Sequence, residues 1–156
     1  MFSYYGSKSK IIHLYPPPMF DTVVEPFAGS ARYALRYPDR KVVINDLDPT
    51  IYGIWKWLVE EATVERVMAW PELKVGERLD QCDNLTAEER NLLGFTVQFG
   101  VYTPRITVSE FSAKRNEMKT VKDRVLRHLS CAELTKPERD LLAFSLGGGR
   151  QDANRY

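Results

Sequence analysis

Val23-Val24-Glu25-Pro26-Phe27-Ala28-Gly29-Ser30-Ala31, followed by Val43-Ile44-Asn45-Asp46-Leu47-Asp48, is the part of the sequence that decides the fold. The first run is β-branched and breaks into a small turn with a glycine, and the second ends in a carboxylate. This pattern is typical of a nucleotide-binding βαβ unit. We therefore predict an α/β fold, with strands over about 22–27 and 41–47 and a helix over about 30–36 between them.

The side chains of the turn indicate a cofactor without phosphates. Ala28, Gly29 and Ser30 are small, so a ligand can approach the backbone and the N–H groups of the following helix. A second glycine that would make room for a pyrophosphate is missing, and Glu25 would repel a polyanion. Asp46 would accept hydrogen bonds from a ribose diol. The alternative is two ordinary buried strands, with Gly29 as a turn residue and Asp46 as a solvated acid.

Three motifs follow one another in the first fifty residues: Tyr4-Tyr5-Gly6-Ser7-Lys8, Glu25-Pro26-Phe27-Ala28-Gly29-Ser30-Ala31 and Asn45-Asp46-Leu47-Asp48. In content and order they resemble the Dam-type family of DNA adenine-N6 methyltransferases. The resemblance is strong over about the first sixty residues and loose beyond them. It implies a partial Rossmann-like S-adenosylmethionine-binding unit over 1–61, and a mainly helical, target-recognition-like region over 62–156. A bacterial or phage restriction-modification setting is typical of the resemblance.

The resemblance also implies which residues hold S-adenosylmethionine. Lys8 and the aromatic ring of Tyr4 would flank the bound cofactor. The turn would line its methionine and sugar, and Asp46 would hold the ribose. The expected set is Tyr4, Lys8, Glu25, Phe27, Ala28, Gly29, Ser30 and Asp46.

The stretch from 105 to 130 has seven basic and three acidic residues. Such an excess suits a surface that lies on the phosphates of double-stranded DNA, and a solvated helix face is the alternative. The stretch also has the position of the family's recognition region. We predict DNA contacts from Arg105, Lys114, Arg115, Lys119 and Lys122.

The D-P-P-Y-type segment with which the family grips the flipped adenine is not found in this sequence. Tyr15-Pro16-Pro17-Pro18 lacks the preceding Asp, Asn or Ser and precedes the first strand, so it is interpreted as a linker. We therefore assign no catalytic residue and expect a truncated portion, inactive alone, that a second polypeptide or a C-terminal segment completes. The alternative is a non-catalytic S-adenosylmethionine- or DNA-binding module that regulates or blocks a full-length methyltransferase. Another adenosine-binding enzyme is a third hypothesis.

Capping signals predict three further helices. Asp48 before Pro49 predicts a helix over about 49–61, and capping-box spacing at 86–89 and 135–138 predicts helices from about 87 and 136. Alternation over 93–101 favours a strand, but the neighbouring leucines allow a helix, so the conformation of 92–103 stays open. Two apolar sets should reach the core: Ile11, Ile12 and Leu14 from a short helix over 9–15, and Ile51, Ile54, Trp55, Leu58 and Val59 from the helix over 49–61.

The composition is that of an ordinary globular protein. With 156 residues, 44% hydrophobic residues and a net charge of +1, the chain has the size and balance of one ordinary globular domain. Its two cysteines are too few for a disulfide scaffold or a zinc site, and the two histidines lack partners at metal-ligand spacing. We expect no metal. No stretch is long and apolar enough for a membrane span or a signal core, so we expect a cytoplasmic protein.

Overall fold

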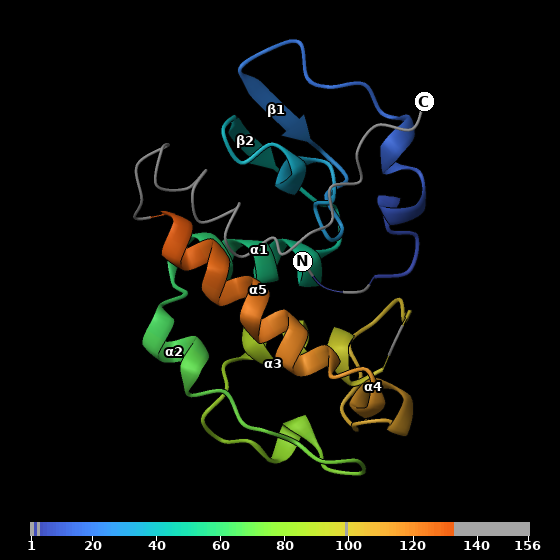
Figure 1. The fold of residues 1–156 in the computed structure, drawn as a ribbon. Helices are drawn as coiled ribbons and strands as arrows, with labels where there is room; N and C mark the ends of the chain where they lie inside the picture. Colours follow the sequence, from blue (N-terminus) through green and yellow to red (C-terminus); the bar gives the residue numbers. More distant parts are fainter. Residues whose placement is uncertain (1, 3, 99, 133–156) are drawn as a thin grey trace.

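A small parallel sheet lies at one end of the molecule and a group of helices at the other (Figure 1). The computed structural model describes residues 2, 4–98 and 100–132. The sheet consists of β1, Thr22–Glu25, and β2, Lys41–Ile44, paired in parallel. Both strands form where the sequence predicts them, but each ends two to three residues earlier than expected. The protein is therefore a mixed α/β chain with a small parallel sheet.

The connection from β1 to β2 differs from the predicted helix over 30–36. It is a series of turns that contains only a 3₁₀ helix, η3, Ala34–Arg36. Gly29 and Ala31 have positive φ angles of 49° and 47°, which right-handed helical backbone excludes. The buried Glu25 carboxylate accepts the N–H of Ala34 at 3.0 Å, so the chain folds around this acid instead of forming a helix.

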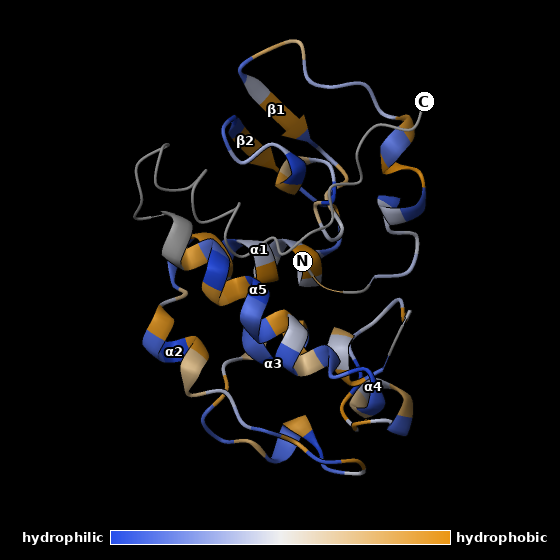
Figure 2. Ribbon diagram, viewed as in Figure 1, coloured by the Kyte–Doolittle hydropathy of each residue, from blue (hydrophilic) through white to orange (hydrophobic). Residues whose placement is uncertain are grey.

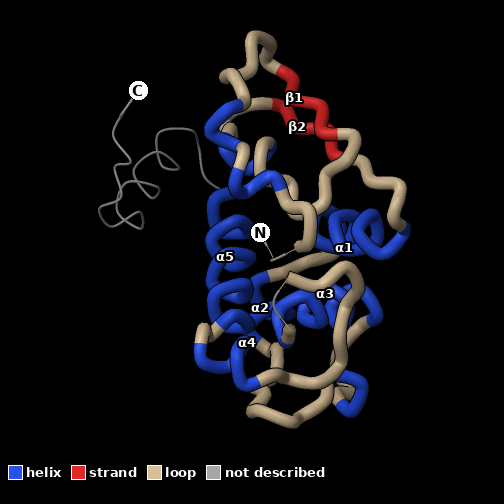
Figure 3. The backbone as a smooth tube through the Cα atoms, turned by 90° about the vertical axis from the view of Figure 1, so that its right-hand side faces the viewer, coloured by secondary structure: helices blue, strands red, loops and turns tan. Residues whose placement is uncertain are grey.

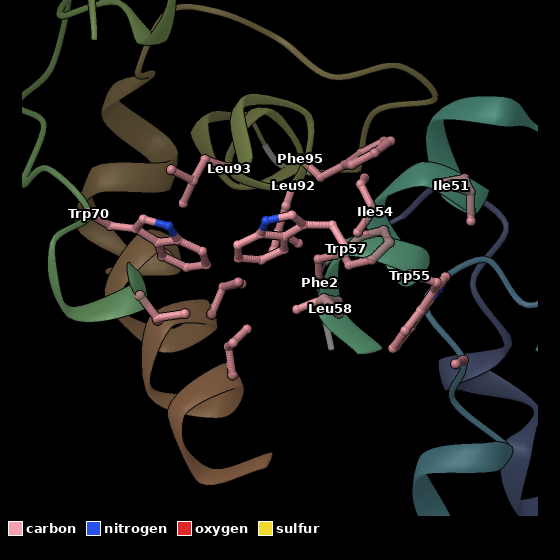
Figure 4. Packing of buried hydrophobic residues seen from close by; sticks show 14 of the residues in the cluster. Phe2, Ile51, Ile54, Trp55, Trp57, Leu58, Trp70, Leu92, Leu93 and Phe95 are labelled. Carbon is pink, nitrogen blue, oxygen red and sulfur yellow. The ribbon is translucent and has the colours of Figure 1, made fainter. Parts of the chain in front are cut away.

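The helix α1, Pro49–Glu60, follows the sheet and begins as predicted. The Asp48 side chain accepts the N–H of Thr50 at 2.8 Å, and Pro49 occupies the first turn. Val59 was expected in the core but is exposed, and Trp57 is buried in addition to the predicted residues. Trp57 stacks on Trp70, with ring centroids 6.1 Å apart (Figure 4). The buried face of α1 is therefore turned toward Trp57 and away from Val59.

Four further α-helices make up the other end of the molecule. They are α2, Val64–Met68; α3, Ala87–Val97; α4, Glu110–Lys114; and α5, Glu117–Ala132. The predicted capping box starts α3, since Thr86 and Glu89 each accept the other's backbone N–H. The segment 92–103, for which the sequence left strand and helix open, is thus helical as far as Val97. Residues 92–97 are all buried because α3 packs against α1 and α5 (Figure 3), and this explains its misleading strand-like pattern.

The N-terminal segment forms two short 3₁₀ helices, η1, Lys8–Lys10, and η2, Ile12–Leu14. Ile11 and Leu14 are exposed, so the prediction that they enter the core is wrong. Each helix is a single turn and contains no buried residue, because this segment lies along the surface beside the sheet rather than over it (Figure 1).

One hydrophobic core connects the two ends of the molecule. Phe2 stacks on Phe95 of α3 with ring centroids 5.1 Å apart, and the same cluster includes Val23 of β1 and Val125 of α5. Along α5, hydrophobic and hydrophilic stretches alternate, as expected for a helix with one buried face (Figure 2). A further 3₁₀ turn, η4, Leu79–Gln81, closes the loop before α3. The predicted helix from about 136 lies outside the described residues.

Candidate functional site

The turn after β1 and the end of β2 meet at one point. The N–H of Gly29 donates to Asp46 Oδ2 at 2.8 Å, and the N–H of Asp48 donates to Asp46 Oδ1 at 3.0 Å. A backbone hydrogen bond from Ala28 to the carbonyl of Asn45, at 3.0 Å, adds a second link. The carboxyl ends of parallel strands lie at the same edge of a sheet, which is where open α/β sheets bind ligands. The two segments singled out in the sequence therefore lie together at one edge of the sheet, as a single candidate site.

Two features of position 29 favour glycine: a positive φ angle of 49° and little room for a side chain. A Cβ there would lie 3.2 Å from Cδ1 of Tyr4, and the positive φ angle adds strain for any other residue. The indole N–H of Trp55 donates to the Gly29 carbonyl at 2.8 Å. Burial, with the nearby carboxylates of Asp48 and Asp46, raises the pKa of the Tyr4 phenol. The Tyr4 ring and two acids therefore surround the glycine turn.

Lys8 and Glu25 form an ion pair below the turn. Lys8 Nζ lies 2.9 Å from Glu25 Oε1 and donates to the carbonyl of Phe27 at 2.6 Å. Glu25 is only 4% exposed, and its other oxygen accepts the N–H of Ala34. The lysine thus neutralises this acid and ties the N-terminal segment to β1. Asp46 and Asp48 form no ion pair among the described residues, so the negative charge of the site lies on these two acids.

The remaining turn residues differ in exposure. Ala28 and Ser30 are buried, and the Ser30 hydroxyl lies 3.1 Å from the hydroxyl of Ser7. The Phe27 side chain is 72% exposed. Through these contacts the structure brings together all eight residues expected at the cofactor: Tyr4, Lys8, Glu25, Phe27, Ala28, Gly29, Ser30 and Asp46. That they bind it stays a prediction.

A cavity of about 310 Å³ lies between β2 and α1, next to Asp46. Its lining includes Asp46, Tyr52, Trp55 and Lys56. Sequence reasoning took Trp55 as a core residue only, whereas its indole nitrogen also holds the glycine turn. Ser7 lies in the first motif, and its hydroxyl contact with Ser30 was not predicted from the sequence. Nothing in the linear pattern pointed to either contact, because each joins segments 23 or more residues apart.

The five predicted DNA contacts are spread over α4, α5 and the chain beside them. Lys114 ends α4 and Lys119 and Lys122 are on α5. Arg105 lies in the loop before α4, and Arg115 lies between α4 and α5. Three of the five have partners within the protein. Lys114 lies 3.7 Å from Glu110, Arg115 Nε donates to Glu117 at 2.9 Å, and Lys122 Nζ donates to the carbonyl of Met68 at 2.8 Å. Arg105 and Lys119 are exposed. All five stay predictions as DNA contacts.

The described residues contain neither a candidate metal site nor a candidate membrane span. No group of three or more His, Cys, Asp or Glu side chains there is arranged to hold a metal ion. None of the helices in the same part of the chain is long and apolar enough to cross a membrane.

Comparison with known proteins gives the family. No curated protein and no solved structure matches the chain. The family model for D12 class N6 adenine-specific DNA methyltransferase matches residues 4–133, which is more than half of the chain. The match includes all three motifs and the basic stretch, and it confirms the resemblance drawn from the sequence. The chain therefore belongs to the D12 class of N6 adenine-specific DNA methyltransferases.

Proposed function

We propose that this chain is the cofactor-binding and DNA-recognition portion of an S-adenosylmethionine-dependent DNA adenine-N6 methyltransferase. The family supplies the reaction class and a DNA substrate. The observation that carries the rest is the 2.8 Å hydrogen bond between Gly29 and Asp46, which joins the two predicted cofactor segments at one sheet edge. We further propose the division of labour expected from the sequence, with the cofactor held by residues 1–61 and DNA by 62–156.

Asp46 keeps the capacity to bind a ribose. Each of its oxygens accepts one backbone N–H, and an ionised carboxylate has about four acceptor positions. Asp46 is one of the lining residues of the cavity between β2 and α1, and we propose that the nucleoside lies in this cavity. Tyr4 and the backbone of the glycine turn would orient the other end of the cofactor, near the negative charges of Asp46 and Asp48. When bound, S-adenosylmethionine supplies an electrophilic methyl group.

The sheet supports the view that a further segment completes the fold. Val24 and Val43 are partners in the strand register, and both are exposed on the same face. Parallel sheets are normally covered on both faces and have more than two strands. We propose that a polypeptide segment with a D-P-P-Y motif, on the same chain or on another, adds to this partial Rossmann-like unit and supplies the grip on adenine.

Substitution of Asp46 tests the cofactor site. Asp46→Ala should weaken S-adenosylmethionine binding about tenfold or more, because it removes charge-assisted hydrogen bonds worth about 1.5–3 kcal/mol. Calorimetric titration measures the effect, with Asp83→Asn at an exposed loop position as the matched control. Equal affinity of the wild type and the Asp46 variant would end the ribose assignment.

The absence of a D-P-P-Y segment from the sequence favours a second candidate, a non-catalytic module that binds cofactor or DNA and regulates a full-length enzyme. Transfer of a tritiated methyl group to unmethylated DNA separates the two. If a D-P-P-Y-bearing polypeptide added in trans restores transfer, the chain is part of an enzyme. If the chain instead only inhibits a full-length methyltransferase, the hypothesis of a non-catalytic regulatory module is correct. Transfer by the isolated chain would contradict both.

A further inference from the structure

A second, larger cavity lies in the helical part, among α3, α4, α5 and the segment that follows α2. Its volume is about 560 Å³, within the range of small-molecule sites. None of its lining residues belongs to the site around Gly29 and Asp46. The walls are mainly apolar, and Trp70 and Leu93 lie side by side in them (Figure 4). The main apolar lining residues are Trp70, Leu73, Leu93, Val108, Met118 and Leu126.

One buried polar side chain in this wall has no hydrogen-bond partner among the described residues. Ser112 of α4 lines the cavity and is 3% exposed, and its hydroxyl has no hydrogen bond within the described part of the chain. The other hydroxyl in the wall, that of Thr96, already donates to the carbonyl of Leu93 at 2.6 Å. Buried polar groups nearly always have a partner. The Ser112 hydroxyl therefore marks where a ligand's polar group would lie.

The charged residues at the rim do not favour a charged ligand. Glu117 is paired with Arg115 at 2.9 Å, and the Lys122 ammonium donates to the carbonyls of Met68 and Trp70. The other charged lining residues carry both signs, and they are Glu72, Asp123 and Lys119. Such a rim has no strong net field, and an anion would meet carboxylates there.

We infer that this cavity binds an uncharged, flat aromatic molecule with one hydrogen-bonding group. The face of the ring would lie against Trp70 and Met118, since aromatic rings and thioether sulfur both make favourable contacts with aromatic ligands. The single polar group would bond the Ser112 hydroxyl. This site is separate from the proposed cofactor site and does not depend on it.

Indole and indene test the inference, because they share a shape and differ in one N–H group. In calorimetric titrations of the full chain, indole should bind about tenfold more tightly than indene. Ser112→Ala should abolish this preference and leave indene binding unchanged. Ser9→Ala, at an exposed serine, is the matched control. A preference that survives in Ser112→Ala would overturn the role of the hydroxyl.

Two further measurements do not need the Ser112→Ala variant, in case it does not fold. In a titration with indole followed by NMR, the largest shifts should fall on the Trp70 indole N–H and the Met118 methyl group. Met118→Trp should fill the cavity and remove binding of both probes. Shifts elsewhere, or no binding of indole at millimolar concentration, would refute the site.

Discussion

Glu25 is the residue on which the geometry of the glycine turn most depends. It is buried at the end of β1, and its two oxygens hold the Lys8 ammonium and the Ala34 N–H. One acid thereby fixes both the N-terminal motif and the chain that leaves the turn. A carboxylate is therefore needed at position 25 of the motif for its two structural contacts, although Lys8 neutralises its charge.

Replacement of this acid should be costly. Glu25→Ala should lower the free energy of unfolding by about 3 kcal/mol, because it leaves buried donors without their acceptor. Urea unfolding at neutral pH measures the change. The control is Asp21→Ala in the Arg40 ion pair, where the acid is 99% exposed, and it should cost less than about 1 kcal/mol. Equal effects of the two variants would show that burial of Glu25 is unimportant.

Glu89 gives a prediction on pH. Burial opposes ionisation of its carboxyl, but hydrogen bonds from Arg66, the Thr86 N–H and the Trp70 indole outweigh it, so the pKa lies below its usual 4.5. Because the pKa is lower in the folded state, this network stabilises the fold fully above about pH 4.5. That stability is lost as the pH falls through the folded pKa.

Glu89→Gln should therefore destabilise the protein at pH 7 and lose less additional stability than the wild type on acidification to pH 3. Unfolding in urea at the two pH values gives the comparison, and Glu88→Gln is the neighbouring control. If Glu89→Gln lost as much folding stability between pH 7 and pH 3 as the wild type, the Glu89 carboxyl would not be the source of the pH dependence.

At the scale of elements, α3 organises the helical part, and a glycine lets a loop cross it. A Cβ on Gly94 would lie 2.5 Å from Cβ of Pro104 and 2.9 Å from the carbonyl oxygen of Arg105. The Arg105 N–H donates to the Gly94 carbonyl at 3.0 Å at the same crossing. Only glycine allows this approach of backbone to backbone.

Two Gly→Ala variants should change the free energy of unfolding in opposite directions. Gly94→Ala should destabilise by about 1–3 kcal/mol, since the loop must move away from α3. Gly53→Ala in α1 has open space, with the nearest atom 4.0 Å away, and should stabilise by about 0.5–1 kcal/mol. Thermal unfolding of both variants measures this. Stabilisation by both would mean that the loop yields without cost.

For the whole molecule, the question is whether the basic stretch binds DNA. Of the five predicted contacts, Arg105 and Lys119 are exposed, and neither has an ion pair or side-chain hydrogen bond among the described residues, so they are the sharpest test. Arg105→Gln combined with Lys119→Gln should weaken DNA binding. It should also reduce the slope of log affinity against log salt by about 0.9 for each lost phosphate contact. Lys10→Gln combined with Lys41→Gln, at two exposed positions outside the basic stretch, is the control. An unchanged slope in the Arg105 and Lys119 variant would show that this face is only solvated.

The features that the sequence determined by itself are those that depend on neighbouring residues in the chain. The β-branched runs predicted both strands, the Asp48 cap and the Thr86 capping box predicted two helix starts, and the ordered motifs predicted the family. These signals depend on residues close together in the chain, so they survive without tertiary context.

Only the tertiary structure decided the features that depend on contacts between distant segments. The Glu25 carboxylate replaced the expected helix after β1 with turns, and complete burial turned the alternating residues of α3 into a central helix. The same holds for the contact of Gly29 with Asp46 and for the unpartnered Ser112 hydroxyl. The physical reason is that burial and long-range hydrogen bonds can outweigh local propensity by several kcal/mol, and no short stretch of sequence contains them.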